Sequence, residues 1–197
     1  MNVIKAYRRN EMFIQTEDTP NPETLKFMPG ENVLQKGTED FSNLEAAKIS
    51  PLASRLFEVD GVSRVFLGSD FISVTKNVDV DWNTLKPSIL TSIMEHYASG
   101  FPILNDIQKK DLEDNNIEDT ETIKQIKDLL ETRVRPAVAM DGGDITFCSF
   151  EDGIVTLQMK GACAGCPSST ATLKMGIENM LRHYIPEVTE VKAAELL

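Results

Sequence analysis

Cysteine, histidine and basic residues are all scarce in this sequence. Its 197 residues include three cysteines and two histidines, and 20 lysines and arginines stand against 31 aspartates and glutamates. So few cysteines do not make a disulfide framework in a chain of this length, and we therefore expect a reducing compartment. The net charge of −11 predicts no nucleic-acid partner, because phosphate binding requires a basic surface.

Long apolar runs are absent as well. No segment reaches the roughly 18 apolar residues that a membrane-spanning helix needs, so we expect no membrane partner. Residues 1–11 include Lys5, Arg8 and Arg9, but they contain no apolar core of a secretory signal and are short for an organellar targeting sequence. We therefore interpret residues 1–11 as a flexible leader.

An acidic, polar stretch divides the chain into two parts. Residues 105–119 contain six acidic residues and two lysines, and few of their side chains could join a core. Gly100 would end a helix that arrives from the N-terminal side. We predict an N-terminal domain over residues 12–100, a flexible linker over residues 101–119 and a C-terminal domain over residues 120–197. The expected fold class is α+β, with two small domains built of α/β layers.

The N-terminal domain is expected to combine short strands with two helices. The strands are predicted at residues 12–16, 25–27, 62–67 and 71–75. One helix should begin at Pro51, with Ser50 as its cap. A second helix, over residues 84–99, is predicted from apolar residues at helical spacing, namely Leu85, Ile89, Ile93, Met94 and Tyr97.

The C-terminal domain is predicted to have the order helix, hairpin, cysteine loop, helix. Apolar residues recur at helical spacing from Ile123 to Val134, and Pro136 is expected near the end of that helix. The strands are predicted at residues 145–150, 154–159 and 188–191. Asp152-Gly153 suits a tight type I′ turn, so the first two of these strands should form a hairpin.

Asp141 and Asp144 are the nearest approach in the sequence to a catalytic pair of acids. Two glycines stand between them, a composition that is typical of a tight turn before a strand. We therefore assign no catalytic residue and expect that the protein is not an enzyme.

Cys163 and Cys166 form a Cys-x-x-Cys pair within Gly-Ala-Cys-Ala-Gly-Cys-Pro. This spacing lets two sulfurs converge on one ion, and it recurs in zinc, iron–sulfur and dithiol sites. The small residues around the pair allow the loop to wrap closely around a bulky group. Pro167 suits the first position of a helix, and the positive end of a helix favours thiolates over thiols. We predict that Cys163 and Cys166 bind a metal or a cluster as thiolates.

The remaining ligands are not obvious within one chain. The predicted hairpin places Cys148 on an apolar face, where we expect it to pack as a small core residue. On a straight helix His183 would lie about 25 Å from Cys166 along the axis, too far to bind the same metal. His96 belongs to the other domain. We therefore interpret both histidines as surface or half-buried residues. Zinc and a cubane cluster each take four ligands, and two symmetry-related chains would supply them. Ligand counting thus predicts a homodimer bridged by a metal centre.

The residues alone leave three kinds of site open. An iron–sulfur cluster and a zinc ion that bridges two chains both fit the pair, and a thiol–disulfide oxidoreductase would also benefit from stabilised thiolates. The segment lacks the tryptophan-led loop and the βαβ context of such oxidoreductases. We therefore rank cluster binding first, zinc second and redox catalysis third.

Both parts of the chain resemble one known family. Gly161-Ala-Cys-Ala-Gly-Cys-Pro-Ser-Ser-Thr170 resembles the NifU-like C-terminal domain, and Val134-Arg-Pro-Ala and Asp141-Gly-Gly-Asp144 match its upstream pattern. Met12-Phe-Ile-Gln-Thr16 and Thr19-Pro-Asn-Pro-Glu-Thr-Leu-Lys-Phe27 resemble the N-terminal domain of Nfu proteins. The two regions cover nearly the whole chain except the leader and the linker, in the order found in bacterial and mitochondrial Nfu proteins.

The resemblance implies an iron–sulfur cluster scaffold or carrier. In that family, Cys-x-x-Cys pairs from two subunits hold a labile [4Fe–4S] cluster, and these ligand roles carry over to Cys163 and Cys166 only. The implied partners are an upstream assembly scaffold as donor and apo iron–sulfur enzymes as acceptors, with the N-terminal domain guiding docking. The implied location is the bacterial cytoplasm, or the mitochondrial matrix if the protein is eukaryotic.

Overall fold

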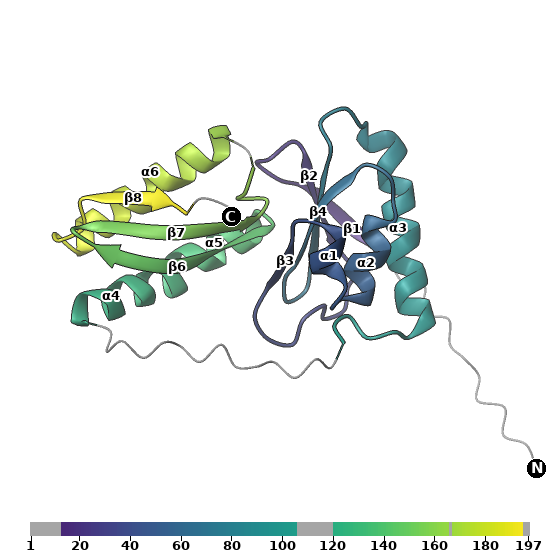
Figure 1. Cartoon of the computed structure of the whole chain (residues 1–197), viewed down its shortest axis with the longest axis horizontal. Helices are drawn as coiled ribbons and strands as arrows, with labels where there is room; N and C mark the ends of the chain where they lie inside the picture. Colours follow the sequence, from purple (N-terminus) through teal and green to yellow (C-terminus); the bar gives the residue numbers. More distant parts are fainter. Residues whose placement is uncertain (1–12, 106–119, 166, 195–197) are drawn as a thin grey trace, which may run out of the picture.

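The computed structural model describes residues 13–105, 120–165 and 167–194, and for residues 167–169 it describes the backbone alone. Two α+β domains lie side by side (Figure 1). The prediction of a mixed α+β chain with two domains is therefore confirmed. The predicted leader and most of the predicted linker lie outside the described residues, and the domain boundaries stay predictions.

A five-stranded antiparallel sheet with helices on one face makes up the N-terminal domain (Figure 1). The strand order is β1-β2-β5-β4-β3. The strands are β1 (Gln15–Asp18), β2 (Thr24–Met28), β3 (Glu39–Phe41), β4 (Val62–Leu67) and β5 (Ile72–Lys76). The helices are α1 (Leu44–Ala47), α2 (Pro51–Phe57) and α3 (Trp82–Ser99). The sequence patterns missed β3 and α1, which are only three and four residues long.

Local signals fix the ends of the longer helices. Ser50 Oγ accepts a hydrogen bond from Ala53 N at 3.1 Å and caps α2, and Gly100 ends α3 in the left-handed conformation. Three residues of the expected stripe on α3 are buried, namely Leu85, Ile89 and Ile93. Met94 is 47% exposed, contrary to expectation, and the side chain of His96 is buried instead.

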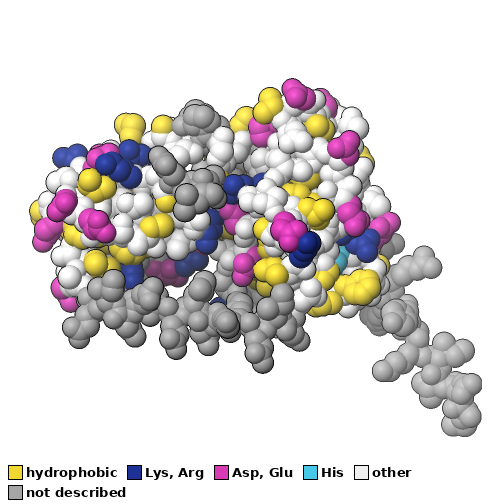
Figure 2. All heavy atoms as spheres, viewed as in Figure 1, with side chains coloured by type: hydrophobic (Ala, Val, Ile, Leu, Met, Phe, Trp, Pro, Cys, Tyr) yellow, Lys and Arg dark blue, Asp and Glu magenta, His cyan; other side chains and the backbone are white. Residues whose placement is uncertain are grey.

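The second face of the N-terminal sheet, opposite its helices, is also buried. Side chains alternate between the faces along a strand, so Val65 and Leu67 join the core under the helices while Phe66 points the other way. Buried residues of this second face include Thr24, Lys26, Phe66, Phe71 and Ser73. The C-terminal domain lies against this face (Figure 1), and Figure 2 shows lysine and arginine side chains along the seam between the domains.

The C-terminal domain packs its helices on a three-stranded sheet of order β6-β7-β8. The strands are β6 (Gly143–Glu151), β7 (Ile154–Gly161) and β8 (Glu190–Ala193). The helices are α4 (Glu121–Leu129), the π-helical η1 (Leu130–Val134), α5 (Arg135–Met140) and α6 (Pro167–Tyr184). Alternate residues of β7 are buried in one core with residues from α4, η1, α5 and α6. The helices therefore cover one face of this sheet.

The first helical segment does not end near Pro136, as the sequence suggests. It passes through the five π-helical residues of η1 and continues as α5, with Pro136 in the first turn. A proline has no N–H to donate to the preceding turn, and the wider π-helical turn before it accommodates this loss. The continued helix carries Arg135 toward the start of β6.

A β-bulge corrects the expected position of Cys148. The hairpin turns at Asp152 and Gly153, whose φ angles of 51° and 80° fit the predicted type I′ turn. The register of β6 and β7 then shifts between Phe147 and Ser149, so the two-residue alternation breaks at Cys148. Its side chain is exposed rather than packed in the core.

One buried carboxylate joins three elements. Arg135 donates to both carboxylate oxygens of Asp144, at 2.8 and 2.9 Å, and Thr38 of the N-terminal domain donates at 2.8 Å. Burial alone would raise the pKa of Asp144, but the hydrogen bonds from Arg135 and Thr38 outweigh it and hold that pKa below its ordinary value. Asp144 is therefore a buried carboxylate that depends on its partners.

We expect the substitution Asp144→Asn to lower the free energy of unfolding by about 2 kcal/mol, because it removes the charge that satisfies Arg135. Urea denaturation followed by circular dichroism measures this loss. Since the folded-state pKa of Asp144 is lowered, the contribution of its carboxylate to the free energy of unfolding is complete at neutral pH and disappears as the pH falls below about 4.

Glu131→Gln is the matched control. Its carboxylate also binds Arg135 but is exposed, so it should cost less than about 0.5 kcal/mol. Equal losses in both variants would contradict this assignment.

Candidate functional site

The cysteine loop, residues 161–166, joins the end of β7 to the start of α6. Gly161 and Gly165 both have positive φ angles, 59° and 83°, which favour glycine and turn the chain twice within five residues. Ala164 N donates to Gly161 O at 3.0 Å, and Thr170 Oγ1 donates to Cys163 O at 3.0 Å. The first of these bonds closes the loop on itself, and the second ties it to α6.

The side chain of Cys163 points into the C-terminal domain. It is only 6% exposed and belongs to the core under the helices. A Cβ atom at Gly143 would lie 2.5 Å from Cys163 Sγ, so only glycine permits this close approach. The Asp-Gly-Gly-Asp segment is thus more than the turn that the sequence predicts, because its second glycine makes room for the sulfur.

The described geometry favours the protonated thiol of Cys163 over the thiolate that the sequence predicts. Burial raises the pKa of the Cys163 thiol to about 12, and the carboxylates of Asp141 and Asp144 act in the same direction. The helix end therefore does not lower the pKa of the Cys163 thiol in this arrangement, and the binding of a metal or a cluster by Cys163 stays a prediction. Local burial and two carboxylates outweigh the helix dipole, whose effect falls off within one turn.

Cys166 lies outside the described residues, so the pairing of the two sulfurs stays a prediction. Among the described residues, no group of three or more histidine, cysteine, aspartate or glutamate side chains is placed to hold a metal ion. His183 is exposed and stacks edge-on against Tyr184, and His96 is buried in the other domain. Neither histidine is brought to the cysteine loop.

The N-terminal domain contacts the loop on both sides of Cys163. The buried Asn21 donates from Nδ2 to Ala164 O at 3.3 Å. The ring of Phe66 lies so close to Gly161 that a Cβ atom there would meet it at 2.8 Å. Asn21 belongs to a segment whose composition a turn alone explains, so sequence reasoning missed this contact.

The same domain also contacts the turn that leads into β6. Ser73 Oγ donates to Gly142 O at 2.6 Å, and Lys26 Nζ donates to Met140 O at 3.0 Å. A Cβ atom at Gly142 would lie 2.7 Å from Ser73 Oγ, so the first glycine of Asp-Gly-Gly-Asp permits the domains to meet. Side-chain donors of one domain thus pair with main-chain carbonyls of the other.

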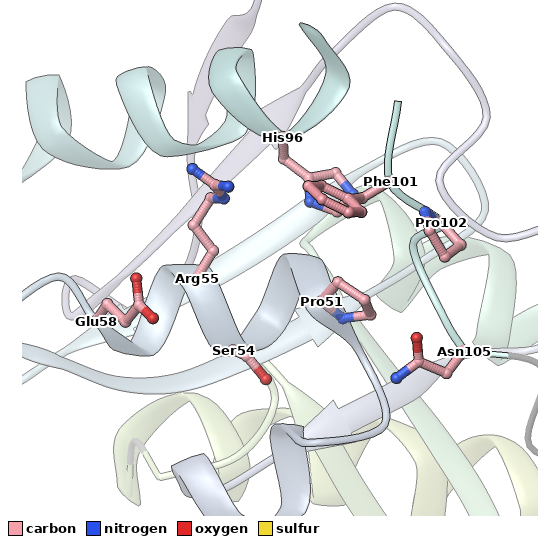
Figure 3. Close-up of a pocket in the computed structure, with 8 residues that line it drawn as sticks. All are labelled: Pro51, Ser54, Arg55, Glu58, His96, Phe101, Pro102 and Asn105. Carbon is pink, nitrogen blue, oxygen red and sulfur yellow. The ribbon is translucent and has the colours of Figure 1, made fainter. Parts of the chain in front are cut away.

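A separate hollow of about 410 Å³ lies on the helical side of the N-terminal domain (Figure 3). Residues of α2, the end of α3 and residues 101–105 line it. Burial first, and Arg55 second, lower the pKa of His96, and a contact with the backbone of Phe101 acts in the opposite direction. The cysteine loop meets the opposite face of this sheet, so this hollow is not part of the candidate site.

A larger groove of about 980 Å³ runs along β6, where the exposed Cys148 lines it together with Arg135 and Asp144. Thr38 contributes from the N-terminal domain. The described residues bring neither histidine to this groove. Cys148 therefore stays outside the candidate ligand set, as the sequence analysis proposed, although it lies on the surface and not in the core.

Comparisons with known proteins cover both domains. Residues 14–100 match the family model of the scaffold protein Nfu/NifU N-terminal domain, and residues 126–192 match that of the NifU-like domain. A solution structure of a NifU-like protein from Saccharomyces cerevisiae is 27% identical and covers 48% of this chain and 86% of its own, with a TM-score of 0.44. No helix in the described part of the chain combines the length and the hydropathy of a membrane span.

Curated relatives match along almost the whole chain. "NifU-like protein 4, mitochondrial" of Arabidopsis thaliana is 54% identical over 189 residues, which are 94% of this chain and 67% of that protein. "NFU1 iron-sulfur cluster scaffold homolog, mitochondrial" of Drosophila sechellia is 52% identical over 185 residues, 93% of this chain and 65% of that protein. This chain thus spans about two thirds of the length of these relatives. It belongs to the Nfu family, whose N-terminal domain and NifU-like domain it carries in that order.

Proposed function

We propose that this chain is a non-enzymatic iron–sulfur cluster carrier. Two copies hold one [4Fe–4S] cluster through Cys163 and Cys166 of each chain and pass it to apo-proteins. The observation that carries this proposal is the Cys-x-x-Cys loop within a matched NifU-like domain. The Drosophila relatives are named iron–sulfur cluster scaffold homologs, and this name supports the same role.

The chemistry of the loop suits a cluster as cargo. Thiolates are the usual ligands of a cubane, and one chain offers two of the four that are needed. Nothing lies within 4 Å of the place where a side chain at Gly165 would begin, so the loop is open beside the second cysteine. A bulky inorganic group can approach the loop from this open side.

Sharing the ligands between two chains explains how the cargo can leave. Each chain contributes only two Fe–S bonds, so acceptor thiols can replace them in steps as the two chains separate. The thiol of Cys163 must lose its proton before it binds iron, because only the thiolate is a ligand. Loading therefore requires surroundings of Cys163 that differ from the buried state.

A cluster as cargo implies two kinds of partner protein, a donor and acceptors. A donor must assemble the cluster upstream, and apo iron–sulfur enzymes must accept it. Because the curated relatives are named mitochondrial, we favour the mitochondrial matrix over the bacterial cytoplasm.

A thiol–disulfide oxidoreductase is the second candidate, and one observation favours it. β8 pairs with β7 in parallel, so β7, the cysteine loop, α6 and β8 form the βαβ unit that the sequence analysis did not expect. The buried, protonated thiol of Cys163 counts against this activity, because the attacking group must be a thiolate. A zinc-bridged dimer stays a third candidate, which metal analysis separates.

Anaerobic reconstitution with iron and sulfide should load about four of each per two chains. Cys163→Ser and Cys166→Ser should each abolish loading, because a dimer of either variant keeps only two of the four thiolate ligands of the cubane. Cys148→Ser is the matched control and should load normally, since Cys148 is exposed on β6. Metal and sulfide analysis with visible absorption measures the outcome. A stable dimer that holds one zinc ion and refuses iron and sulfide would falsify the proposal.

The loaded protein should sediment as a dimer, and removal of the cluster with an iron chelator should reduce the dimer fraction, because the cluster supplies the bonds that join the chains. Analytical ultracentrifugation under anaerobic conditions measures this change. Cys148→Ser should behave like the unaltered chain. A loaded protein that stays monomeric contradicts the shared site, and disulfide-reductase turnover by the cluster-free chain would favour the second candidate.

A further inference from the structure

The cysteine loop is held from both sides of Cys163 by the second face of the N-terminal sheet and its neighbouring turn. Asn21 binds the carbonyl of Ala164, and Phe66 packs on Gly161. Both contacts are buried, and both come from the other domain. The loop can therefore change its shape only if these contacts are released.

The held shape is not the shape that binds cargo. Cys163 Sγ lies against Gly143 and belongs to the core of the C-terminal domain, so the sulfur is enclosed by its own chain. To meet a cluster at a subunit seam, the sulfur must turn out of this core. Such a turn moves the neighbouring Ala164, whose carbonyl Asn21 holds.

The space above the loop is occupied as well. The N-terminal domain covers the backbone at Gly161 and Ala164, three residues apart, with Cys163 between them. A second cysteine loop with a cluster cannot enter where Asn21 and Phe66 already lie. The docked chain is thus closed to its partner on the side of Cys163.

The contacts are of a kind that can be released. Asn21, Ser73 and Lys26 donate to main-chain carbonyls, and water can replace each of these bonds at a small net cost. Interfaces between domains of one chain resemble transient interfaces, so relative motion of the domains is the default expectation. Phe66 and Phe71 supply an apolar centre that favours the docked state.

We propose that the N-terminal domain is an autoinhibitory cap on the cysteine loop. In the cluster-free chain it holds Cys163 inward and blocks the second chain, and its release frees the loop to accept a cluster. This inference rests on the proposed function, but the position of Cys163 in the cluster-free chain can be tested without any cluster.

Asn21→Asp in the full-length, cluster-free chain is the sharpest test. The Oδ1 atom of Asn21 accepts a hydrogen bond from Glu23 N at 3.0 Å within its own turn, and an aspartate keeps this acceptor. The substitution removes only the donor to Ala164 and sets a carboxylate against that carbonyl. The rate of alkylation of Cys163 by iodoacetamide should rise about tenfold, because the loss of a buried hydrogen bond makes opening of the loop easier. Peptide mass spectrometry measures the rate.

Two controls allow this alkylation rate to be interpreted. Alkylation of the exposed Cys148 in the same chain should not change. Asn43→Asp makes the same chemical change at an exposed helix cap on α1 and should leave Cys163 slow. A new carboxylate near Cys163 would by itself disfavour the thiolate, so a faster reaction reports access to the sulfur and not its charge.

Ser73→Ala is a second, independent variant in case Asn21→Asp destabilises the turn. It removes the bond to Gly142 O and should also accelerate alkylation of Cys163, with an unaltered circular dichroism spectrum. Unchanged alkylation rates in both variants, or a Cys163 that already reacts as fast as Cys148 in the unaltered chain, would overturn the proposed cap.

If the cap is present, Asn21→Asp and Ser73→Ala should also load iron and sulfide faster than the unaltered chain and reach the same final amount. Faster alkylation without any loading would support the cap and reject the carrier function.

Discussion

The second face of the N-terminal sheet has to be covered, and the rest of the structure depends on how this is done. Helices cover only one face, yet the other face carries Phe66 and Phe71 beside Lys26 and Ser73, all of them buried. The covering surface must therefore offer both apolar contact and hydrogen-bond acceptors. The C-terminal domain meets this demand with backbone, because Gly142 O and Met140 O accept hydrogen bonds from Ser73 and Lys26. The absence of side chains at Gly142 and Gly161 lets Ser73 and Phe66 approach closely. The glycines that shape the loop also allow the domains to meet.

The buried carboxylate of Asp144 connects the contact between the domains to the interior of the C-terminal domain. Its carboxylate binds Arg135 within the domain and Thr38 across the seam, and it lies close enough to Cys163 to disfavour the thiolate. The π-helical turn before Pro136 places Arg135 beside it. One buried charge therefore links the helix, the start of β6, the other domain and the protonation of a candidate ligand, so these features cannot change independently.

Local signals made much of this fold predictable. The Ser50 cap, the Asp152-Gly153 turn and the place of the cysteine loop between a hairpin and a helix each depend on a few neighbouring residues. The failures are non-local. Cys148 turns outward because the register shifts against β7, and β8 runs parallel to β7 because α6 crosses over between them. The inward position of Cys163 depends on Gly143 and on a domain more than 100 residues away, so no pattern around the cysteine pair contains it.

Burial of Cys163 also resolves a conflict between storing a thiol and using it. A carrier needs thiolates when cargo arrives, but an empty carrier with exposed thiolates is open to oxidation, because reactivity follows the thiolate fraction and access. In the docked chain burial raises the pKa of the Cys163 thiol to about 12 and leaves this residue only 6% exposed, so both factors disfavour oxidation. Under the proposed cap, release of Asn21 and Phe66 lets the sulfur turn out of the core, and that movement removes both protections together. In the proposed carrier, the interactions that close the loop to a second chain would therefore also preserve the ligand that the second chain requires.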